Sequence, residues 1–198
     1  MKDSEITVIS VGPGDHDMIT LRGLKAIEAQ EMIIGMTDSV ETFAKHKPHY
    51  IPKNMRADSI EFIKNCPAKK IGVLVSGDAG FFSLSRFITK EFENVKVIAG
   101  VSSMCAGFAL IKKMWFSYRF ISVHGRELLD ECPSESTVIL CDEVNSPDAI
   151  IKKFPQITEK FDFYILCDVS LPTEAVYTEL KGSYGTSRII LVLEEKTA

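Results

Sequence analysis

Three short runs in the first half of the chain, one continuously apolar (71–75) and two rich in β-branched residues, each lead into a loop of small residues. The runs and their loops are, in order, 6–11 with 12–15, 71–75 with 76–81, and 95–98 with 100–103. A continuous apolar run bounded by turn residues is typical of a strand buried on both faces of a parallel sheet. Because a helical pattern follows each loop, the sequence predicts repeated strand–loop–helix units of an α/β fold.

The topology of such a fold brings the three loops together. Right-handed crossovers place the loops that follow parallel strands at the same edge of the sheet. Ligands of open α/β sheets bind outside the carboxyl ends of the strands. We therefore expect the three loops to form a binding surface. The alternatives are that 76–81 is only a structural connection and that Gly12-Pro13-Gly14 is a plain β-turn.

The residue types in these loops argue against a phosphate site. The dinucleotide fingerprint GxGxxG requires a third glycine where this chain has Asp17, and no Walker pattern GxxxxGK[ST] is present. Pro13 also lacks the amide that a pyrophosphate would use. The loops contain Asp15 and Asp78 but no basic residue. This composition favours a zwitterionic or cationic ligand.

Strands dominate the second half of the chain. We expect them at 119–123, 136–140, 161–167, 175–181 and 188–193, with a helix at 147–154. One short connection favours antiparallel pairing and therefore a mixed sheet. The sequence predicts two α/β domains, residues 1–115 with a parallel sheet covered by helices on both faces, and residues 116–198 with a mixed sheet.

Composition excludes several classes of protein. The 198 residues carry a net charge of −4, which provides no basic field for nucleic acid. The five cysteines are odd in number and contain no CxxC pair, so we expect free thiols in a reducing cytosol and no metal site. The N-terminus lacks the apolar region of a signal peptide, and no run is long enough to span a membrane. A cytoplasmic protein without a membrane partner is expected.

No nucleophile motif of the GxSxG or HExxH type is present. His124 and Arg126 stand out because they directly follow a predicted strand, although a solvated turn is an equal alternative. Arg126 has the planar fork that grips a carboxylate. Other basic residues lie near loop ends or the domain junction: Arg22, Arg86, Lys112, Lys113 and Arg119. The aromatic residues expected in the core are Phe81, Phe82, Phe108, Trp115 and Phe116.

Several segments resemble the tetrapyrrole (uroporphyrin-III and precorrin) methylases. They are VGPGD with DMITLRGLKAI after it, VSGDAGFFSL, and IAGVSSMCAGFALI, in the order and spacing of that family. The segments FISVHGR, ILCDEVNSPDAI and FYILCDVSLPTEAVYTELKG are similar to one branch, the cobalt-precorrin-7 (precorrin-6Y) C5-methyltransferases of cobalamin biosynthesis. The resemblance implies a two-domain enzyme that transfers a methyl group from S-adenosylmethionine in the cleft between its domains.

The resemblance also implies roles for individual residues. Those implied for S-adenosylmethionine are Pro13, Gly77, Asp78, Phe81, Ser102 and Ser103, completed by Asp142 and Leu171. Those implied for the tetrapyrrole are Gly14, Asp15 and Arg126, with His124 assisting proton removal from the macrocycle. No metal is expected to be bound by the protein itself, and whether the substrate carries cobalt stays open.

Other functions remain alternatives. The chain is either a C5-methyltransferase, a methylase of the same fold acting on another precorrin carbon or on a protein residue as in diphthamide synthesis, or a non-catalytic ligand-binding module. The intact loops argue against the last of these. A homodimer is usual for the family. Longer relatives fuse a C15-methylase/decarboxylase, and because this chain stops at Ala198, that activity is expected in a separate protein.

Overall fold

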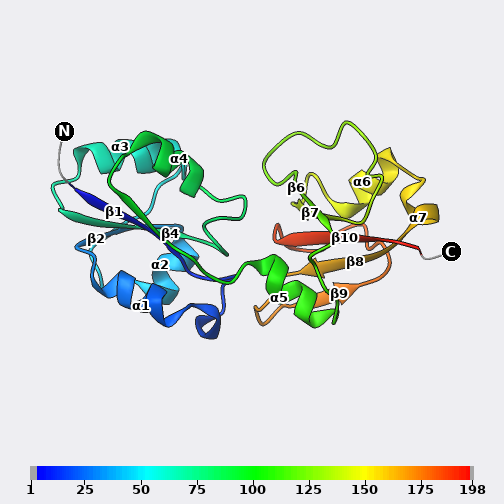
Figure 1. Cartoon of the computed structure of the whole chain (residues 1–198), viewed down its shortest axis with the longest axis horizontal. Coiled ribbons are helices and arrows are strands. Elements are labelled where there is room, and N and C mark those ends of the chain that lie inside the picture. The colour runs from blue at the N-terminus through cyan, green and yellow to red at the C-terminus, as the bar shows by residue number, and fades with distance from the viewer. Residues whose placement is uncertain (1–3, 197–198) are drawn as a thin grey trace. The chain divides into compact units, whose positions relative to one another are not determined.

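The computed structural model describes residues 4–196, which form two compact units, one up to Ser103 and one from Met104. Each unit contains one five-stranded sheet. The division lies ahead of the boundary predicted at 115–116, because α5 (Ser103–Leu110) and the turn after it group with the second sheet (Figure 1).

The first unit alternates strands with helices, as the sequence predicts. Its strands are β1 (Glu5–Ser10), β2 (Met32–Ile34), β3 (His49–Tyr50), β4 (Lys70–Val75) and β5 (Val95–Ile98). Its helices are η1 (His16–Met18), α1 (Leu21–Glu28), α2 (Thr37–Phe43), α3 (Ala57–Asn65) and α4 (Ser85–Glu91). Thr20 caps α1 by accepting a hydrogen bond from the Gly23 amide at 2.9 Å, which confirms the predicted helix start.

All strands of this sheet are parallel, in the order β3-β2-β4-β1-β5. The strand β1 lies between β4 and β5, and these three strands are the ones whose loops were singled out in the sequence. Their carboxyl ends therefore meet at one edge of the sheet. The predicted convergence of the three loops is confirmed.

Helices cover both faces of the first sheet. On one face, Ile63 of α3 and Ile88 of α4 pack with strand residues such as Val8 and Val73. On the other face, Ile27 of α1 and Val40 of α2 pack with strand residues that include Ile9 and Leu74. Because Val8 and Ile9 face opposite sides of the sheet and both are buried, the central strand is apolar at neighbouring positions.

The second unit has a mixed sheet in the order β6-β7-β10-β8-β9. Its strands are β6 (Arg119–Ser122), β7 (Thr137–Cys141), β8 (Phe161–Cys167), β9 (Ala175–Tyr177) and β10 (Ile189–Glu195). The pair β6–β7 is parallel and the other three pairs are antiparallel, which confirms the predicted mixed sheet.

Helices also cover this second sheet. One face packs against α6 (Pro147–Lys153) and α7 (Ile157–Lys160) through residues such as Ile150 and Ile157. Gly107 of α5 lies against β8, because a Cβ on this glycine would come within 2.6 Å of Leu166 Cδ1. The absence of a side chain at position 107 therefore sets how closely α5 approaches its sheet.

Some predicted elements differ from the structure. The helix expected directly after the second loop begins only at Ser85, because Phe82 has a φ of +49° that interrupts a helix. The strand expected to reach residue 181 ends at Tyr177, and α7 was not predicted. Phe82, Trp115 and Phe116 are 41%, 44% and 81% exposed, so their expected placement in the core is wrong, whereas Phe108 is buried.

None of the helices within residues 4–196 has both the length and the apolar character needed to cross a membrane.

Candidate functional site

The first two loops of the first unit are joined through their backbones. The amide of Gly77 donates to the carbonyl of Gly12 at 2.7 Å, and the amide of Gly12 donates back to Gly77 at 3.3 Å. Both glycines have positive φ, +77° for Gly12 and +68° for Gly77. A Cβ on Gly12 would lie 2.7 Å from the carbonyl oxygen of Met18, so only glycine fits there.

Ser10, at the end of β1, connects the second loop with β5. Its hydroxyl donates to the carbonyl of Ile98 at 2.6 Å and accepts from the amide of Ala79 at 2.8 Å. The side chain is fully buried. A Cβ on Gly100 would lie 2.5 Å from Ser10 Cβ, so the third loop passes close against this serine. The sequence analysis missed Ser10, although a polar residue ending a buried strand was the signal.

Asp78 ties the second loop to the third. Its Oδ2 accepts from the amide of Gly100 at 2.7 Å, and its Oδ1 accepts from the amide of Gly80 at 2.8 Å. Each carboxylate oxygen thus already holds one backbone amide. Each also has a second lone-pair site that a ligand could use. Asp78 therefore positions the second and third loops relative to each other.

Gly77, Ser102 and Ser103 lie beside one another. A Cβ on Gly77 would lie 3.7 Å from Ser102 Cα and 3.8 Å from the Ser103 amide nitrogen. A side chain at position 77 would therefore point at the start of α5. The structure brings together these three residues of the predicted cofactor set, and Asp78 is the neighbour of Gly77 in the same turn.

The remaining predicted residues of the first unit belong to the same loops. Pro13 is buried, and Gly14 and Asp15 are half-buried. Asp15 Oδ1 accepts from the Asp17 amide at 2.8 Å and so caps η1. Phe81 packs edge-on against Phe82, with 4.9 Å between the ring centroids.

Loops of the second unit also gather at one edge of their sheet. β6 and β7 are parallel, and β7 and β8 both pair antiparallel with β10, so all three strands run in the same direction. The segments that follow these strands contain His124, Arg126, Asp142 and Leu171, which the sequence analysis placed in the site. The topology thus puts these four residues at the same edge.

The ring of His124 is held by a backbone group. His124 Nδ1 lies 3.0 Å from the carbonyl oxygen of Cys141, which can only accept a hydrogen bond. In the neutral ring, Nδ1 must therefore carry the proton and Nε2 must be the acceptor. The residue is exposed. An exposed imidazole with its lone pair on Nε2 has the form that a proton acceptor needs.

Asp142 fixes the backbone around His124. Its Oδ2 accepts from the Gly125 amide at 2.7 Å, and its Oδ1 accepts from the amides of Val144 and Asn145 at 2.9 and 2.7 Å. Although partial burial raises the pKa of this carboxyl, the three amides and the nearby His124 outweigh it and hold the pKa below its usual value. Asp142 is thus ionised and engaged at both oxygens.

Asn145, which the sequence analysis did not single out, holds the same loop from a second side. Its Nδ2 donates to the carbonyls of Val123 and Arg126 at 2.9 and 2.8 Å. Only an amide nitrogen can donate twice in this way while the residue stays neutral. The signal in the sequence was an asparagine three residues after an aspartate at a strand end. The Arg126 side chain is exposed, and its Nη1 lies 3.5 Å from the carbonyl of Ser122.

Leu171 follows a tight turn that is organised by a buried carboxylate. Asp168 accepts hydrogen bonds from the hydroxyls of Thr173 and Thr186 at 2.7 and 2.6 Å, and its backbone carbonyl accepts from the Leu171 amide at 2.8 Å. Asp168 has a φ of +47°. The structure places Leu171, half-buried, on a segment that is shaped locally by these contacts.

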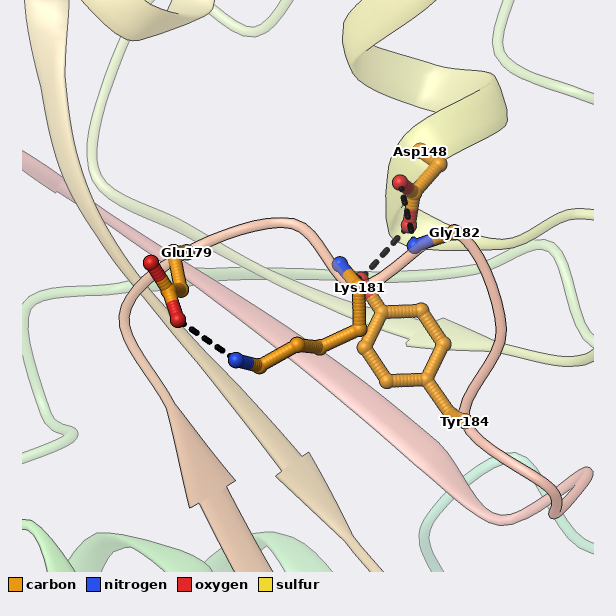
Figure 2. A network of polar contacts seen from close by, with 5 residues as sticks. All are labelled: Asp148, Glu179, Lys181, Gly182 and Tyr184. Carbon is orange, nitrogen blue, oxygen red and sulfur yellow. Dashed lines mark hydrogen bonds and ion pairs between the residues drawn. The ribbon is translucent and has the colours of Figure 1, made fainter.

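The long connection from β9 to β10 is pinned to the start of α6 (Figure 2). Tyr184 Oη donates to Asp148 Oδ2 at 2.6 Å, and the amide of Gly182 donates to Asp148 Oδ1 at 3.0 Å. Lys181 pairs with Glu179 at 2.5 Å on the same connection. Burial and the Asp148 carboxylate raise the pKa of Tyr184, so this phenol stays protonated. The network is a structural anchor.

The cysteines of this chain are unpaired with one another. All five cysteines are free, and burial raises the pKa of Cys167 to about 11, which keeps this thiol protonated. In the part of the chain that the structure describes, no three His, Cys, Asp or Glu side chains group so that they could hold a metal ion.

The chain belongs to the tetrapyrrole (corrin/porphyrin) methylases, since the model of that family matches residues 5–182. A probable cobalt-precorrin-7 C(5)-methyltransferase of Methanocaldococcus jannaschii is 32% identical over 129 residues, which are 62% of this chain and 61% of that protein. A cobalt-precorrin-4 C(11)-methyltransferase of the same organism is 30% identical over 120 residues, 54% of this chain and 46% of that protein. Each alignment spans less than two thirds of the relative.

Solved structures share the fold along the whole chain. The precorrin-6Y methylase of Archaeoglobus fulgidus has a TM-score of 0.74 at 18% identity and covers 98% of this chain and 99% of that one. The uroporphyrin-III C-methyltransferase of Thermus thermophilus, in complex with S-adenosylhomocysteine, has a TM-score of 0.65 at 14% identity, with 97% and 98% covered. The family resemblance seen in the sequence and the predicted fold class are confirmed.

Proposed function

We propose that this protein transfers a methyl group from S-adenosylmethionine to C5 of cobalt-precorrin-7 in cobalamin biosynthesis. Membership of the tetrapyrrole methylases supports the reaction class. The relative that is 32% identical supports the C5 position. The single structural observation that carries the proposal is the edge of the first sheet, where three glycine-containing loops are tied together by Asp78 and by the Gly12–Gly77 bridge.

These loops fit the methyl donor by their chemistry. They present backbone groups, serine hydroxyls and the carboxylates of Asp15 and Asp78, with no cation among them. S-adenosylmethionine carries a sulfonium and an ammonium, and when bound it supplies an electrophilic methyl group. We assign Gly77, Ser102 and Ser103 to its binding, because a side chain at position 77 would enter the space in front of both serines.

In this proposal the second unit also contributes residues to the binding of cofactor and substrate. Asp142 and Leu171 would complete the contacts of the cofactor, while Gly14, Asp15 and Arg126 would face the tetrapyrrole. A methyl displacement needs in-line placement more than a strong base, and positioning supplies about 7–11 kcal/mol in favourable systems. His124 would take the proton that leaves the macrocycle, because its Nδ1 is already committed to the Cys141 carbonyl.

A second candidate is methylation of another carbon of the macrocycle. The relative that methylates C11 of cobalt-precorrin-4 favours it, although its alignment is shorter and less identical than that of the C5 relative. We further propose that the protein is a cytoplasmic homodimer. A non-catalytic ligand-binding module would keep the loops but transfer no methyl group.

One assay separates these functions. The protein is incubated with cobalt-precorrin-7 and S-adenosylmethionine that carries a ¹³C-methyl group, and the labelled carbon is located by NMR. Label at C5 is expected. Label at another carbon supports the second candidate, and no transfer to any precorrin supports the binding module. Calorimetry should show binding of S-adenosylmethionine but not of NADH, and the reverse result would refute the methylase proposal.

The cofactor assignment has its own test in Gly77→Val. The variant adds a branched side chain at a φ of +68°, facing Ser102 and Ser103, and is expected to weaken S-adenosylhomocysteine binding at least about tenfold. Gly182→Val is the matched control, since Gly182 has a φ of +75° and a Cβ there would have nothing within 4 Å. If Gly77→Val folds and binds like the control, the site lies elsewhere.

A further inference from the structure

Two arginines of the first unit stack on the same phenylalanine. The guanidinium carbon of Arg56 lies 3.9 Å from the centroid of the Phe87 ring, and that of Arg86 lies 4.4 Å from it. Arg56 comes directly before α3, whereas Arg86 and Phe87 lie in the first turn of α4. Contacts of this kind hold a cation in place through the negative face of the ring. Two charges from different helices are therefore held close together.

Neither charge is neutralised by the protein. Within residues 4–196, no carboxylate forms an ion pair with Arg56 or Arg86. Asp58, two residues after Arg56, is already engaged by the backbone amides of Lys53 and Asn54. Glu91, at the far end of α4, pairs with Lys64. Both guanidinium groups stay charged at every working pH.

The pair lies at the sheet edge where the loops converge. In a parallel α/β sheet, a helix that follows a strand starts at the carboxyl edge of that sheet. α3 follows β3, and α4 follows β4, and both helices cover the same face. Arg56 and Arg86, at the starts of these helices, therefore sit beside the loop that contains Gly77 and Asp78.

A strained aromatic residue precedes the pair. Phe82 has a φ of +49° and is 41% exposed, in the turn that leads into α4. Positive φ is an outlier for a bulky side chain, and such strain is retained where the surroundings or a ligand require it. An exposed ring four residues before Arg86 offers an apolar surface next to positive charge.

We propose that Arg56 and Arg86 form a clamp for the peripheral carboxylates of the tetrapyrrole substrate. This rests on the proposed function, since the macrocycle is the polycarboxylate of that reaction. The cofactor is a poor occupant, because its sulfonium and ammonium would be repelled by two guanidinium groups. A guanidinium that is already ordered by stacking loses less conformational freedom on binding, so each carboxylate contact gains affinity.

The test compares two corrins of the same shape. Cobyrinic acid carries carboxylates on its periphery, and cobinamide carries amides in their place. Each is titrated by calorimetry into the full chain and into Arg56→Gln, Arg86→Gln and the double variant. Each single change is expected to weaken cobyrinic acid binding about tenfold, the size of a lost charge-assisted hydrogen bond, and to leave cobinamide binding unchanged.

The control is Lys90→Gln. Lys90 lies on α4, in its last turn, so the variant removes the same charge from the same helix at the opposite end. A similar loss of affinity in Lys90→Gln would show a general charge effect and overturn the clamp. Phe87→Leu keeps both charges but removes the ring that orders them, and a partial loss of cobyrinic acid binding is expected. Thermal melts establish that all variants fold.

Binding of S-adenosylhomocysteine keeps this proposal distinct from the proposed function. Its affinity should be the same in the double variant as in the wild type. Suppose that the wild type binds both S-adenosylhomocysteine and cobyrinic acid. If the double variant then binds each compound with an affinity within about twofold of the wild type, the clamp is refuted and the methylase proposal stands. If the wild type binds neither compound, the methylase proposal fails first.

Discussion

The two loop edges of this protein are built in different ways. In the first unit, backbone groups join the first two loops through the reciprocal bonds of Gly12 and Gly77, and only the third loop is tied by a carboxylate, that of Asp78. In the second unit, side chains join the loops, with Asp142 and Asn145 together holding the backbone near His124. The backbone hydrogen bonds between Gly12 and Gly77 require glycine but no charge, whereas the hydrogen bonds to Asp142 depend on the ionisation of its carboxylate. The two edges should therefore fail for different reasons.

The largest effect is expected from adding one methyl group to the first edge. Gly12→Ala combines a φ of +77° with a Cβ only 2.7 Å from the Met18 carbonyl oxygen, and should lower the free energy of unfolding by about 3 kcal/mol. Gly182→Ala has nearly the same φ, +75°, with open space around its Cβ, and should cost about 1 kcal/mol. Urea titration measures both. Equal losses would show that steric fit does not hold this edge.

Removing one carboxylate oxygen from each edge is expected to have a smaller and unequal effect. Asp142→Asn loses the hydrogen bond from the Gly125 amide to the segment after β7 and should lower the free energy of unfolding by about 2 kcal/mol. Asp78→Asn should cost about 1 kcal/mol, because the Gly12–Gly77 bridge and the Ser10 hydroxyl still hold the first edge. Hydrogen exchange at the Gly125 and Gly100 amides reports each join directly. A greater loss of protection from exchange at Gly100 in Asp78→Asn than at Gly125 in Asp142→Asn would contradict the comparison.

The smallest effect is a dependence of stability on pH at the second edge. The pKa of Asp142 in the folded protein lies below its ordinary value of 3.8, so its ionised form stabilises the fold above that pH. This stability is lost as the pH falls through the folded pKa. The difference in unfolding free energy between wild type and Asp142→Asn should thus shrink between about pH 5 and pH 3. A constant difference would contradict the role of the charge.

The parts of the structure that could be predicted from the sequence are those set by local patterns. Thr20 caps α1 as expected, and the three runs at 6–11, 71–75 and 95–98 form adjacent parallel strands. The late start of α4 could not be predicted, because it depends on a left-handed conformation at Phe82 that this residue type rarely adopts.

The contacts of the site that the sequence did not indicate are distant along the chain. Asn145 bonds to Val123 and Arg126, 22 and 19 residues away, and nothing near Asn145 reveals these partners. Arg56 and Phe87 meet only because α3 and α4 cover the same face of the sheet. Such pairs follow from the fold, so a single sequence gives residue types and topology but not these partners.

The close contact between Ser10 and Gly100 has a consequence for how this chain can change in evolution. The two positions share one volume, because a Cβ at 100 would lie 2.5 Å from the Cβ at 10. They are far apart in sequence, yet position 100 cannot accept a side chain while position 10 keeps its Cβ. The buried hydroxyl at 10 also fixes the hydrogen-bond direction between Ala79 and Ile98. Relatives that keep this loop edge should therefore have glycine at position 100 wherever position 10 carries a side chain.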